Sequence, residues 1–404
     1  MAHTATFKRM MNEVVAYGSC CECGSCVLVC PHNVIDYVDG KPKQVAKSTA
    51  PFDYCGISEG IGCDVCAQAC PRLDVREFGL RDAVLPREPG VHEGVFGRYR
   101  RIVAARATDP EVIGRAQDGG VVSAILAHGL REGMWDGAIV SASDPETPAA
   151  PIPRVVTTAE EAILSSRSWY TYSPNDLALA DAQRMGLRRV AFVGVPCQVT
   201  PIRKLQQADA GYLVNGRKKE AHVAKQTKFL KGFADIVDFT LGLLCTEVFT
   251  YQGLMVEKIE RDMGIPLNEV RKFNVKGKVL IHRTDGEVVE MSLHKAQEHA
   301  RPECHHCGDF TAELADISCG GVALMDWTIC VLRSARGEAL FDDMARRGLV
   351  TVRPMDEFEH AMGVLIRLTR KQRDRVPVPP GRGPGYVRPD GWEPVPADPA
   401  RAAD

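Results

Sequence analysis

Two groups of cysteines near the N-terminus are spaced closely enough to surround a small inorganic core. The first group follows the pattern C-x2-C-x2-C-x3-C-P and consists of Cys20, Cys23, Cys26, Cys30 and Pro31. The second group keeps the final C-x2-C-x3-C-P with seven residues before it, and consists of Cys55, Cys63, Cys66, Cys70 and Pro71. This spacing is typical of proteins that hold two [4Fe–4S] clusters.

In this motif the fourth cysteine of each group binds the cluster of the other group. One predicted cluster is therefore bound by Cys20, Cys23, Cys26 and Cys70. The other is bound by Cys55, Cys63, Cys66 and Cys30. Two zinc sites are the alternative, because C-x2-C pairs also suit zinc, but zinc would need neither the third cysteine nor the proline. The long insert sets Cys55 apart from the other ligands, and Cys21 is expected to be a packed thiol.

Four further cysteines lie in distant parts of the chain. Cys197 and Cys245 each follow a predicted strand. In an open parallel sheet the carboxyl ends of the strands lie at one edge, where ligands bind. Cys304 and Cys307 add a pair at metal-binding spacing, and the four thiols together predict a third [4Fe–4S] cluster. A zinc site on this pair and the histidines between them is the alternative.

A pair of glycines opens a predicted helix in the body of the chain. Residues 117–123 read Gln-Asp-Gly-Gly-Val-Val-Ser, and the glycines allow backbone amides to approach a ligand closely. The N-terminus of a helix favours phosphate. A plain turn is the alternative, because two glycines alone also fit one.

Strand-like and helical segments alternate over this part of the chain. Buried strands are predicted at 101–107, 137–143, 189–195 and 238–245, and helices at 123–133, 159–166 and 174–185. This alternation predicts an α/β body with a largely parallel or mixed sheet.

Composition and charge narrow the class of protein. A formal net charge of −2 argues against a nucleic-acid binder. The sequence has no apolar run that could cross a bilayer and no secretory signal at its start, so we expect a cytoplasmic protein, at most peripheral to a membrane through a partner. The fifteen cysteines could build an extracellular disulfide scaffold, but their tight grouping in a long chain favours metal binding.

The cysteine-rich segment resembles a bacterial two-cluster ferredoxin, which implies a small α+β domain that transfers single electrons. The expected domains are a ferredoxin-like unit at 1–90, an α/β body at 91–350, with subregions of about 91–178 and 179–350, and a helical segment with a tail at 351–404. Residues 376–404 are rich in proline and glycine, so we expect an extended or disordered tail, either along a partner subunit or in solvent.

The body resembles the beta subunit of the coenzyme F420-reducing hydrogenases and dehydrogenases. The motifs that carry the resemblance occur in order at 117–120, 165–167, 193–198, 242–247, 273–278, 304–310 and 315–320. The chain departs from the family at one place. After Ala-Asp-Ile-Ser the family usually has a small apolar residue and Gly-Asp, whereas this chain has Cys319, Gly320 and Gly321. A family carboxylate is therefore missing, and Cys319 is expected to be a packed thiol.

The resemblance implies an FAD and a [4Fe–4S] cluster in the body, with coenzyme F420 as the diffusible hydride carrier. The residues implied to hold the phosphates and ribityl chain of the flavin are Gly119, Gly120, Ser123, Ser166 and Arg167, with Gln117 and Val121 from the same segment. Lys276 would lie near the rings or the incoming cofactor, and a solvated lysine in a hairpin turn is the alternative.

The function predicted from these features is an iron–sulfur flavoprotein subunit. It would pass electrons between the hydride carrier at FAD and three [4Fe–4S] clusters, and onward to a partner enzyme or a ferredoxin. Hydride transfer itself requires no side-chain acid or base, so no catalytic residue is assigned. The alternatives are a ferredoxin-driven reductase of a small organic substrate and a subunit that only conducts electrons within a larger redox complex. A hetero-complex or a homo-oligomer is expected.

Overall fold

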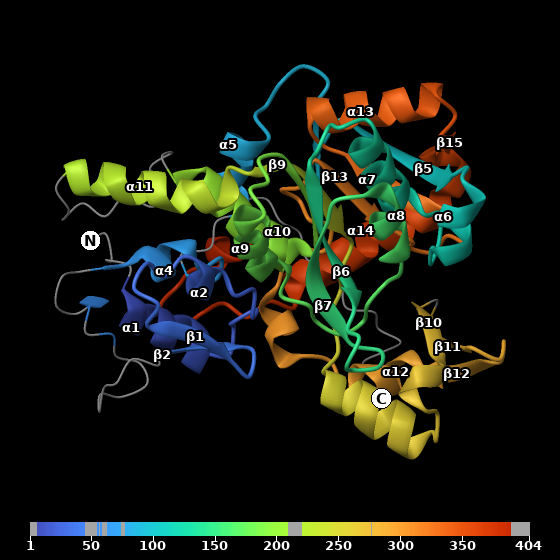
Figure 1. The fold of residues 1–404 in the computed structure, drawn as a ribbon, viewed down its shortest axis with the longest axis horizontal. Coiled ribbons are helices and arrows are strands. Elements are labelled where there is room, and N and C mark those ends of the chain that lie inside the picture. The colour runs from blue at the N-terminus through green and yellow to red at the C-terminus, as the bar shows by residue number, and fades with distance from the viewer. Residues whose placement is uncertain are drawn as a thin grey trace.

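The computed structural model describes residues 6–44, 55, 57–58, 63–73, 77–208, 220–275 and 277–388. A large sheet with helices on both faces forms the body, and a small cysteine-rich unit packs beside it (Figure 1). The expected α/β class with a mixed sheet is confirmed, while the domain boundaries near residues 90 and 350 stay a prediction. Among the described helices, none is long and apolar enough to cross a membrane.

The large sheet has eight strands in the order β15-β5-β14-β13-β9-β8-β6-β7. Its parallel centre consists of β6 (Gly137–Ser143), β8 (Val190–Gly194), β9 (Val237–Leu243) and β13 (Ile317–Gly320). Antiparallel strands flank this centre, namely β5 (Arg101–Ala107), β7 (Pro151–Val156), β14 (Thr328–Leu332) and β15 (Val350–Pro354). The strands expected from the sequence correspond to β5, β6, β8 and β9.

Strand β8 shows how both faces of the sheet become buried. Ala191 and Val193 belong to one apolar cluster, whereas Val190 and Phe192 belong to another, because successive side chains of a strand point to opposite faces. The first face is covered by α6 (Pro110–Arg115), α7 (Val121–Arg131), α8 (Ala159–Leu164) and α13 (Ala335–Arg346). The second is covered by α9 (Ala178–Arg184), α10 (Pro196–Gln206) and α11 (Glu220–Ala234).

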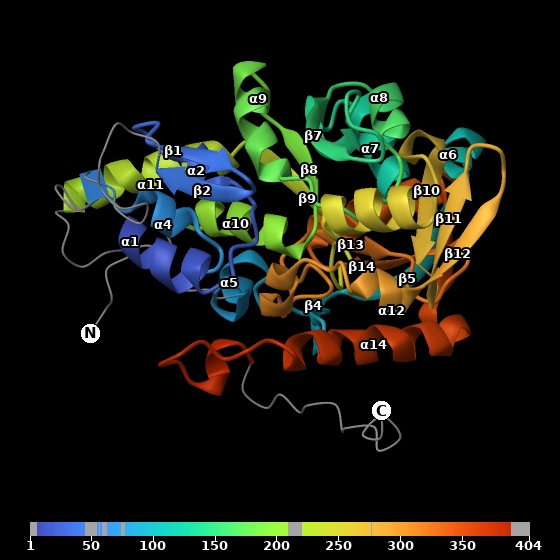
Figure 2. The same ribbon diagram turned by 90° about the horizontal axis from the view of Figure 1, so that it is seen from below.

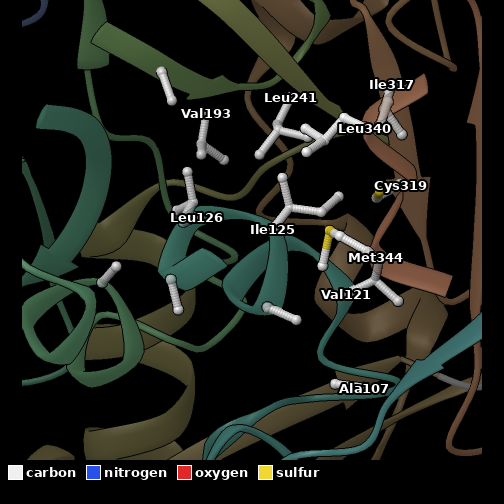
Figure 3. Packing of buried hydrophobic residues seen from close by; sticks show 14 of the residues in the cluster. Ala107, Val121, Ile125, Leu126, Val193, Leu241, Ile317, Cys319, Leu340 and Met344 are labelled. Carbon is white, nitrogen blue, oxygen red and sulfur yellow. The ribbon is translucent and has the colours of Figure 1, made fainter. Parts of the chain in front are cut away.

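Helix α7 is held on the sheet by its apolar side. Val121 and Ile125 are buried, and Ile125 lies in the same cluster as Leu241 of β9 and Leu340 of α13 (Figure 3). This packing positions the start of α7, where the glycine pair lies.

The N-terminal unit contains short helices and one hairpin. Its elements are α1 (Phe7–Met10), a helix at Met11–Ala16, α2 (Ser25–Leu28), β1 (Ile35–Val38), β2 (Lys41–Gln44) and α4 (Val65–Ala69). Phe7, Met10 and Val14 form its apolar core together with several cysteines. The connection to the body contains α5 (Glu77–Val84), β3 (His92–Gly94) and β4 (Gly97–Tyr99).

A second, three-stranded antiparallel sheet projects from the body. It consists of β10 (Val270–Val275), β11 (Lys278–Arg283) and β12 (Val288–Ser292). A helix at Tyr251–Asp262 and α12 (Leu293–Gln297) share an apolar core with it. Short 3-10 turns occur at Asn175–Leu177, Leu267–Glu269, Pro302–His306, Met355–Phe358 and Pro384–Tyr386.

The C-terminal part begins with α14 (Glu359–Asp374), which runs along one side of the molecule (Figure 2). The tail after it was expected to be extended or disordered. As far as residue 388, however, the tail is described and includes a helical turn, and the Arg382 guanidinium lies 3.4 Å from the Glu13 carboxylate. This part of the tail therefore reaches the N-terminal unit.

Candidate functional site

A cavity in the N-terminal unit is lined by one complete set of predicted ligands. Its empty volume is about 380 Å³, and the ligands on its wall are Cys20, Cys23, Cys26 and Cys70. Three of these thiols come from α2 and the turn before it, and the fourth comes from the end of α4. Gly24 makes the turn into α2 with a φ of +82°, a conformation that strains other residues. The structure thus gathers thiols from both sequence groups around one cavity.

The second set of predicted ligands consists of Cys30, Cys55, Cys63 and Cys66. Cys30, Cys55 and Cys66 are buried in the apolar core of the N-terminal unit, and Cys63 is half-buried. Burial raises the pKa of Cys66 well above its ordinary value, and the nearby thiols of the other three raise it further. This set is therefore also close in space.

Buried thiols favour a ligand that brings positive charge. Burial, with Cys21 and Cys70 nearby, raises the pKa of Cys20 to about 12. Burial also raises the pKa of Cys26 and of Cys245 well above the ordinary value. Cysteine binds metal as a thiolate, and the charge of bound iron stabilises that form. The thiols therefore fit iron–sulfur cores.

The body contains a second cavity, which is lined by the third predicted set. Its empty volume is about 370 Å³, and the cysteines on its wall are Cys197, Cys245, Cys304 and Cys307. Pro196 begins α10, so Cys197 lies in the first helical turn directly after β8. Cys245 follows β9, the parallel neighbour of β8, and both thiols therefore reach the same edge of the sheet.

The histidines between the last two cysteines lie away from this cavity. His305 is exposed, and the ring of His306 contacts the ring of Tyr17 edge-on at 5.0 Å between centroids. Neither histidine is on the described wall of the cavity. In the described residues, moreover, no three or more His, Cys, Asp and Glu side chains form a group that could hold a single metal ion.

The two cavities share a wall. Cys21 and Arg72 line both of them. The Cys21 sulfur lies 3.9 Å from the carbonyl oxygen of Cys197, and Arg72 donates a hydrogen bond of 2.7 Å to the carbonyl of His306. A thiol and a guanidinium thus separate the N-terminal set of cysteines from the body set.

A network of charged side chains surrounds this wall. Glu22 pairs with Arg301 at 2.5 Å and with Lys41 at 2.6 Å, and Lys41 also pairs with Glu303 at 2.5 Å. The Arg301 guanidinium lies over the ring of Tyr172, 4.3 Å from its centroid. The network joins residues of the N-terminal unit to residues of the body, so it holds the two cavities beside each other.

Helix α10 contributes a further connection through Lys204. Its amino group donates hydrogen bonds of 2.8 Å and 2.9 Å to the carbonyls of Cys70 and Leu73. The same helix carries Cys197 in its first turn. One helix of the body therefore contacts the backbone of the N-terminal set and also places a cysteine of the body set.

The glycine pair lies where little space is available. A side chain at Gly119 would place its Cβ 2.6 Å from the Ala105 carbonyl oxygen, and Gly120 caps α7 with a φ of +70°. Val121 is buried at the first position of the helix. Glycine is therefore required here for both close packing and backbone conformation.

Polar side chains close to this turn retain unused hydrogen-bonding capacity. Gln117 donates to the Tyr170 hydroxyl at 2.7 Å, and Ser166 donates to Ser123 at 2.6 Å. Within the described residues, the buried Gln117 Oε1 and Arg167 Nε have no hydrogen-bond partner. Unpaired buried donors and acceptors of this kind suit a polar ligand. The residues therefore fit a flavin, which offers both donors and acceptors.

Two predicted features near this turn have different outcomes. Lys276 lies outside the described residues, so its expected place beside the cofactor remains a prediction. Gly321, where the family acid is missing, lies against Asp118, because a Cβ at Gly321 would be 1.9 Å from Asp118 Oδ2. A carboxylate from another segment thus occupies this space.

Cys319, which was expected to be a packed thiol, is buried, and its sulfur lies 4.0 Å from that of Cys330.

Several residues around the cavities were not singled out from the sequence. They are Glu22, Lys41, Arg72, Tyr172, Arg301 and Glu303. Three of them lie within or beside a cysteine motif: Glu22 stands between Cys21 and Cys23, Arg72 follows Pro71, and Glu303 directly precedes Cys304. Position beside a metal-binding motif would have been the one available indication.

Comparisons with known proteins show which family this chain belongs to. Residues 102–180 and 187–358 match the family models for the N-terminal and C-terminal parts of the coenzyme F420 hydrogenase/dehydrogenase beta subunit. The chain belongs to this family. The resemblance seen in the sequence is confirmed, and with it the class of the protein, an oxidoreductase of the hydrogenase and dehydrogenase type.

Individual relatives extend this result. The coenzyme F420 hydrogenase subunit beta of Methanococcus voltae is 34% identical over 69% of this chain and 93% of its own length. The coenzyme F420-dependent sulfite reductase of Methanocaldococcus jannaschii is 30% identical over 90% of this chain, which spans only 52% of that protein. That alignment extends into the cysteine-rich N-terminal region. The solved F420-reducing [NiFe] hydrogenase complex of Methanosarcina barkeri contains a chain that matches with a TM-score of 0.62 and 30% identity, over 70% of this chain and 92% of that one.

Proposed function

We propose that this chain passes electrons between coenzyme F420 and three [4Fe–4S] clusters by way of FAD, as a subunit of a cytoplasmic redox complex. The observation that carries the proposal is the wall shared by two cavities, each lined by a complete set of predicted cluster ligands. The hydride carrier is inferred from the relatives, whose names link them to coenzyme F420.

The three ligand sets are assigned as follows. The inner cluster of the N-terminal unit is bound by Cys20, Cys23, Cys26 and Cys70. The outer cluster is bound by Cys30, Cys55, Cys63 and Cys66. The body cluster is bound by Cys197, Cys245, Cys304 and Cys307. The exchange of the fourth cysteine between the two sequence groups is the pattern of two-cluster ferredoxins, and the grouping of the thiols in space supports it.

The flavin is assigned to the start of α7 and the polar residues around it. The assigned residues are Gln117, Gly119, Gly120, Val121, Ser123, Ser166 and Arg167. The amides at the start of this eleven-residue helix suit phosphate, and the unpaired Gln117 and Arg167 atoms suit further polar groups. When bound, a flavin supplies the chemistry that links two-electron hydride carriers to one-electron centres. The chain itself binds and orients the cofactors.

The wall shared by the two cavities suggests the order in which electrons pass between the clusters. The body cavity adjoins the inner cavity through Cys21 and Arg72, which supports a direct transfer of electrons between the body cluster and the inner cluster. The outer cluster, whose cysteines line neither of these cavities, is assigned the exchange of electrons with a partner enzyme or a ferredoxin. Each hydride corresponds to two electrons, which travel singly along the clusters.

The test uses the full chain purified anaerobically. We expect about twelve irons per chain, from three four-iron clusters, together with one FAD. Reduced coenzyme F420 should bleach the flavin absorbance, whereas NADH and NADPH should not. An iron content of eight per chain would contradict the assignment of the body cluster, and absence of FAD would contradict the assignment of the flavin. Lack of bleaching by reduced F420 would overturn the role of this carrier.

A further inference from the structure

Three cationic side chains and a histidine gather beside the segment assigned to the flavin. This cationic cluster consists of Arg167, Arg271, Lys272 and His282. Lys272 on β10 and His282 on β11 are direct cross-strand partners. The register shifts between Val270 and Lys272, which leaves Arg271 without a cross-strand partner. Arg167 donates a hydrogen bond of 2.6 Å to the Arg271 carbonyl, so the cluster joins the hairpin to the segment after α8.

Arg271, Lys272 and His282 are close enough to disfavour one another's charge. Burial and the neighbouring Arg271 lower the pKa of Lys272, with Asp118 and Asp326 acting in the opposite direction. Burial, Lys272 and Arg271 lower the pKa of His282. In the described part of the chain, none of Arg167, Arg271 and Lys272 forms an ion pair with a carboxylate. The cluster therefore concentrates positive charge that nearby carboxylates balance only in part.

Other cations of the same sheet are arranged differently. Lys278 on β11 pairs with Glu290 on β12. Arg283, at the end of β11, pairs with Glu269 at 2.5 Å and also with Glu287. Lys278 and Arg283 are thus neutralised in place, unlike the cations beside the flavin segment. Repulsion between like charges disfavours such a cluster unless an anion binds to it.

The hairpin is in direct contact with the glycine-rich turn. Asn274 of β10 donates a hydrogen bond of 3.3 Å to the Gln117 carbonyl, and the ring of Phe273 contacts the ring of Tyr170 edge-on at 6.2 Å between centroids. Among the described residues, the buried His282 Nε2 and Asn274 Oδ1 have no hydrogen-bond partner. The cluster thus adjoins the segment assigned to the flavin and retains unused polar atoms.

We propose that Arg271 and Lys272 of the cationic cluster bind the anionic arm of the diffusible hydride carrier, the phosphate and carboxylate groups that coenzyme F420 bears beyond its deazaflavin ring. The inference rests on the function proposed above. The buried start of α7 is already assigned to the phosphates of the resident flavin. Arg271, in contrast, is exposed, which suits a ligand that enters from solvent and leaves again.

The test compares two ligands of the FAD-loaded chain. One is coenzyme F420, and the other is its fragment made of the deazaflavin ring and ribityl chain, without phosphate or carboxylates. Binding is measured under anaerobic conditions from the fluorescence of the deazaflavin. The double variant Arg271→Gln/Lys272→Gln should weaken F420 binding roughly tenfold or more, because it removes two charge-assisted contacts, and should leave binding of the fragment unchanged. Lys278→Gln, which removes a paired lysine of the same hairpin, is the matched control and should change neither.

The outcomes separate the possible sources of the anion. Loss of FAD from the double variant, with F420 affinity retained in the reconstituted chain, would assign the cluster to the flavin phosphates and overturn the inference. An equal loss of affinity for F420 and for the fragment, or no loss of affinity for either, would also overturn the inference. Failure of the unaltered chain to bind either ligand would instead defeat the proposed hydride carrier.

Discussion

The sulfur of Cys21 lies 3.9 Å from the carbonyl oxygen of Cys197, although 176 positions separate the two residues in the chain. Cys21 belongs to the N-terminal unit, and Cys197 lies in the first turn of α10. Two adjacent cavities meet at this contact. The distance between the two sets of cysteines is therefore determined by packing between the N-terminal unit and the body.

Cys21 and Cys23 should differ in their effect on iron content. Cys23→Ser is expected to lower the iron content by about four atoms per chain, because it removes an assigned ligand of the inner cluster. Cys21→Ser should keep about twelve, because Cys21 is assigned to the wall between cavities. Iron analysis of the two anaerobically purified variants measures the difference. Loss of four irons from the Cys21 variant would make Cys21 a ligand.

Arg72 should affect the reduction potentials of two clusters together. Its guanidinium lines both cavities, and a positive charge there stabilises an added electron. Arg72→Met should lower the potentials of the inner and body clusters by about 50 mV, which corresponds to roughly 1.2 kcal/mol for one electron. The outer cluster should change less.

Redox titration followed by electron paramagnetic resonance measures these shifts. Arg87→Met is the matched control, because Arg87 is 73% exposed and pairs with Glu93 at the surface. A shift confined to the outer cluster would contradict the placement of Arg72 between the other two.

The glycine pair should be sensitive to a single methyl group. Gly119→Ala would place a Cβ 2.6 Å from the Ala105 carbonyl oxygen and 2.8 Å from the Thr328 amide nitrogen, both backbone atoms. We expect a loss of about 1–3 kcal/mol of stability and weaker flavin binding. Gly114→Ala in α6 is the control, because nothing lies within 4 Å of its added Cβ. Thermal unfolding and FAD content report the two effects, and equal behaviour of both variants would rule out a steric requirement at Gly119.

Asp316 should stabilise the body through its charge. Burial alone would raise its pKa, but Arg203 and Arg336 lower it from the ordinary value of 3.8 to about 2. Asp316→Asn should therefore cost about 3–5 kcal/mol at neutral pH, because it leaves the buried Arg203 without its carboxylate partner. Asp342→Asn, which affects an exposed pair with Arg101, should cost less than about 1 kcal/mol.

The pH dependence of this effect has a defined sign. A carboxylate with a lowered folded-state pKa stabilises the fold above its ordinary pKa, and this contribution is lost as the pH falls from 3.8 towards about 2. The stability difference between the unaltered chain and Asp316→Asn should therefore shrink over that interval. Unfolding midpoints measured across it provide the check, and a constant difference would point to packing rather than charge.

Local patterns in the sequence predicted the cysteine sets and the strands that position one of them. The spacing of the N-terminal groups is encoded within short segments, and Cys197 and Cys245 follow apolar strands that are easily recognised. The rule that parallel strands end at a common edge then brought the two thiols together. These inferences needed no knowledge of which elements pack against each other.

The docking of the N-terminal unit could not be predicted in this way. Arg72 and Arg301 lie 229 positions apart, and their roles depend on which surfaces meet. A charged residue in a single sequence is usually a solvated one, so its type alone carries no signal. The cationic cluster was missed for the same reason, because the irregular pairing of β10 is a property of the folded sheet.

The contact of Lys204 with Cys70 and Leu73 bears on how the protein could be divided. A cut near residue 90 would take two acceptor carbonyls away from an amino group on α10. It would also leave the backbone at the fourth cysteine of the inner set without its support from the body. We therefore expect the N-terminal unit to be less stable when it is expressed as a separate fragment. A hybrid in which an unrelated ferredoxin replaces this unit would need two backbone carbonyls that accept hydrogen bonds from Lys204.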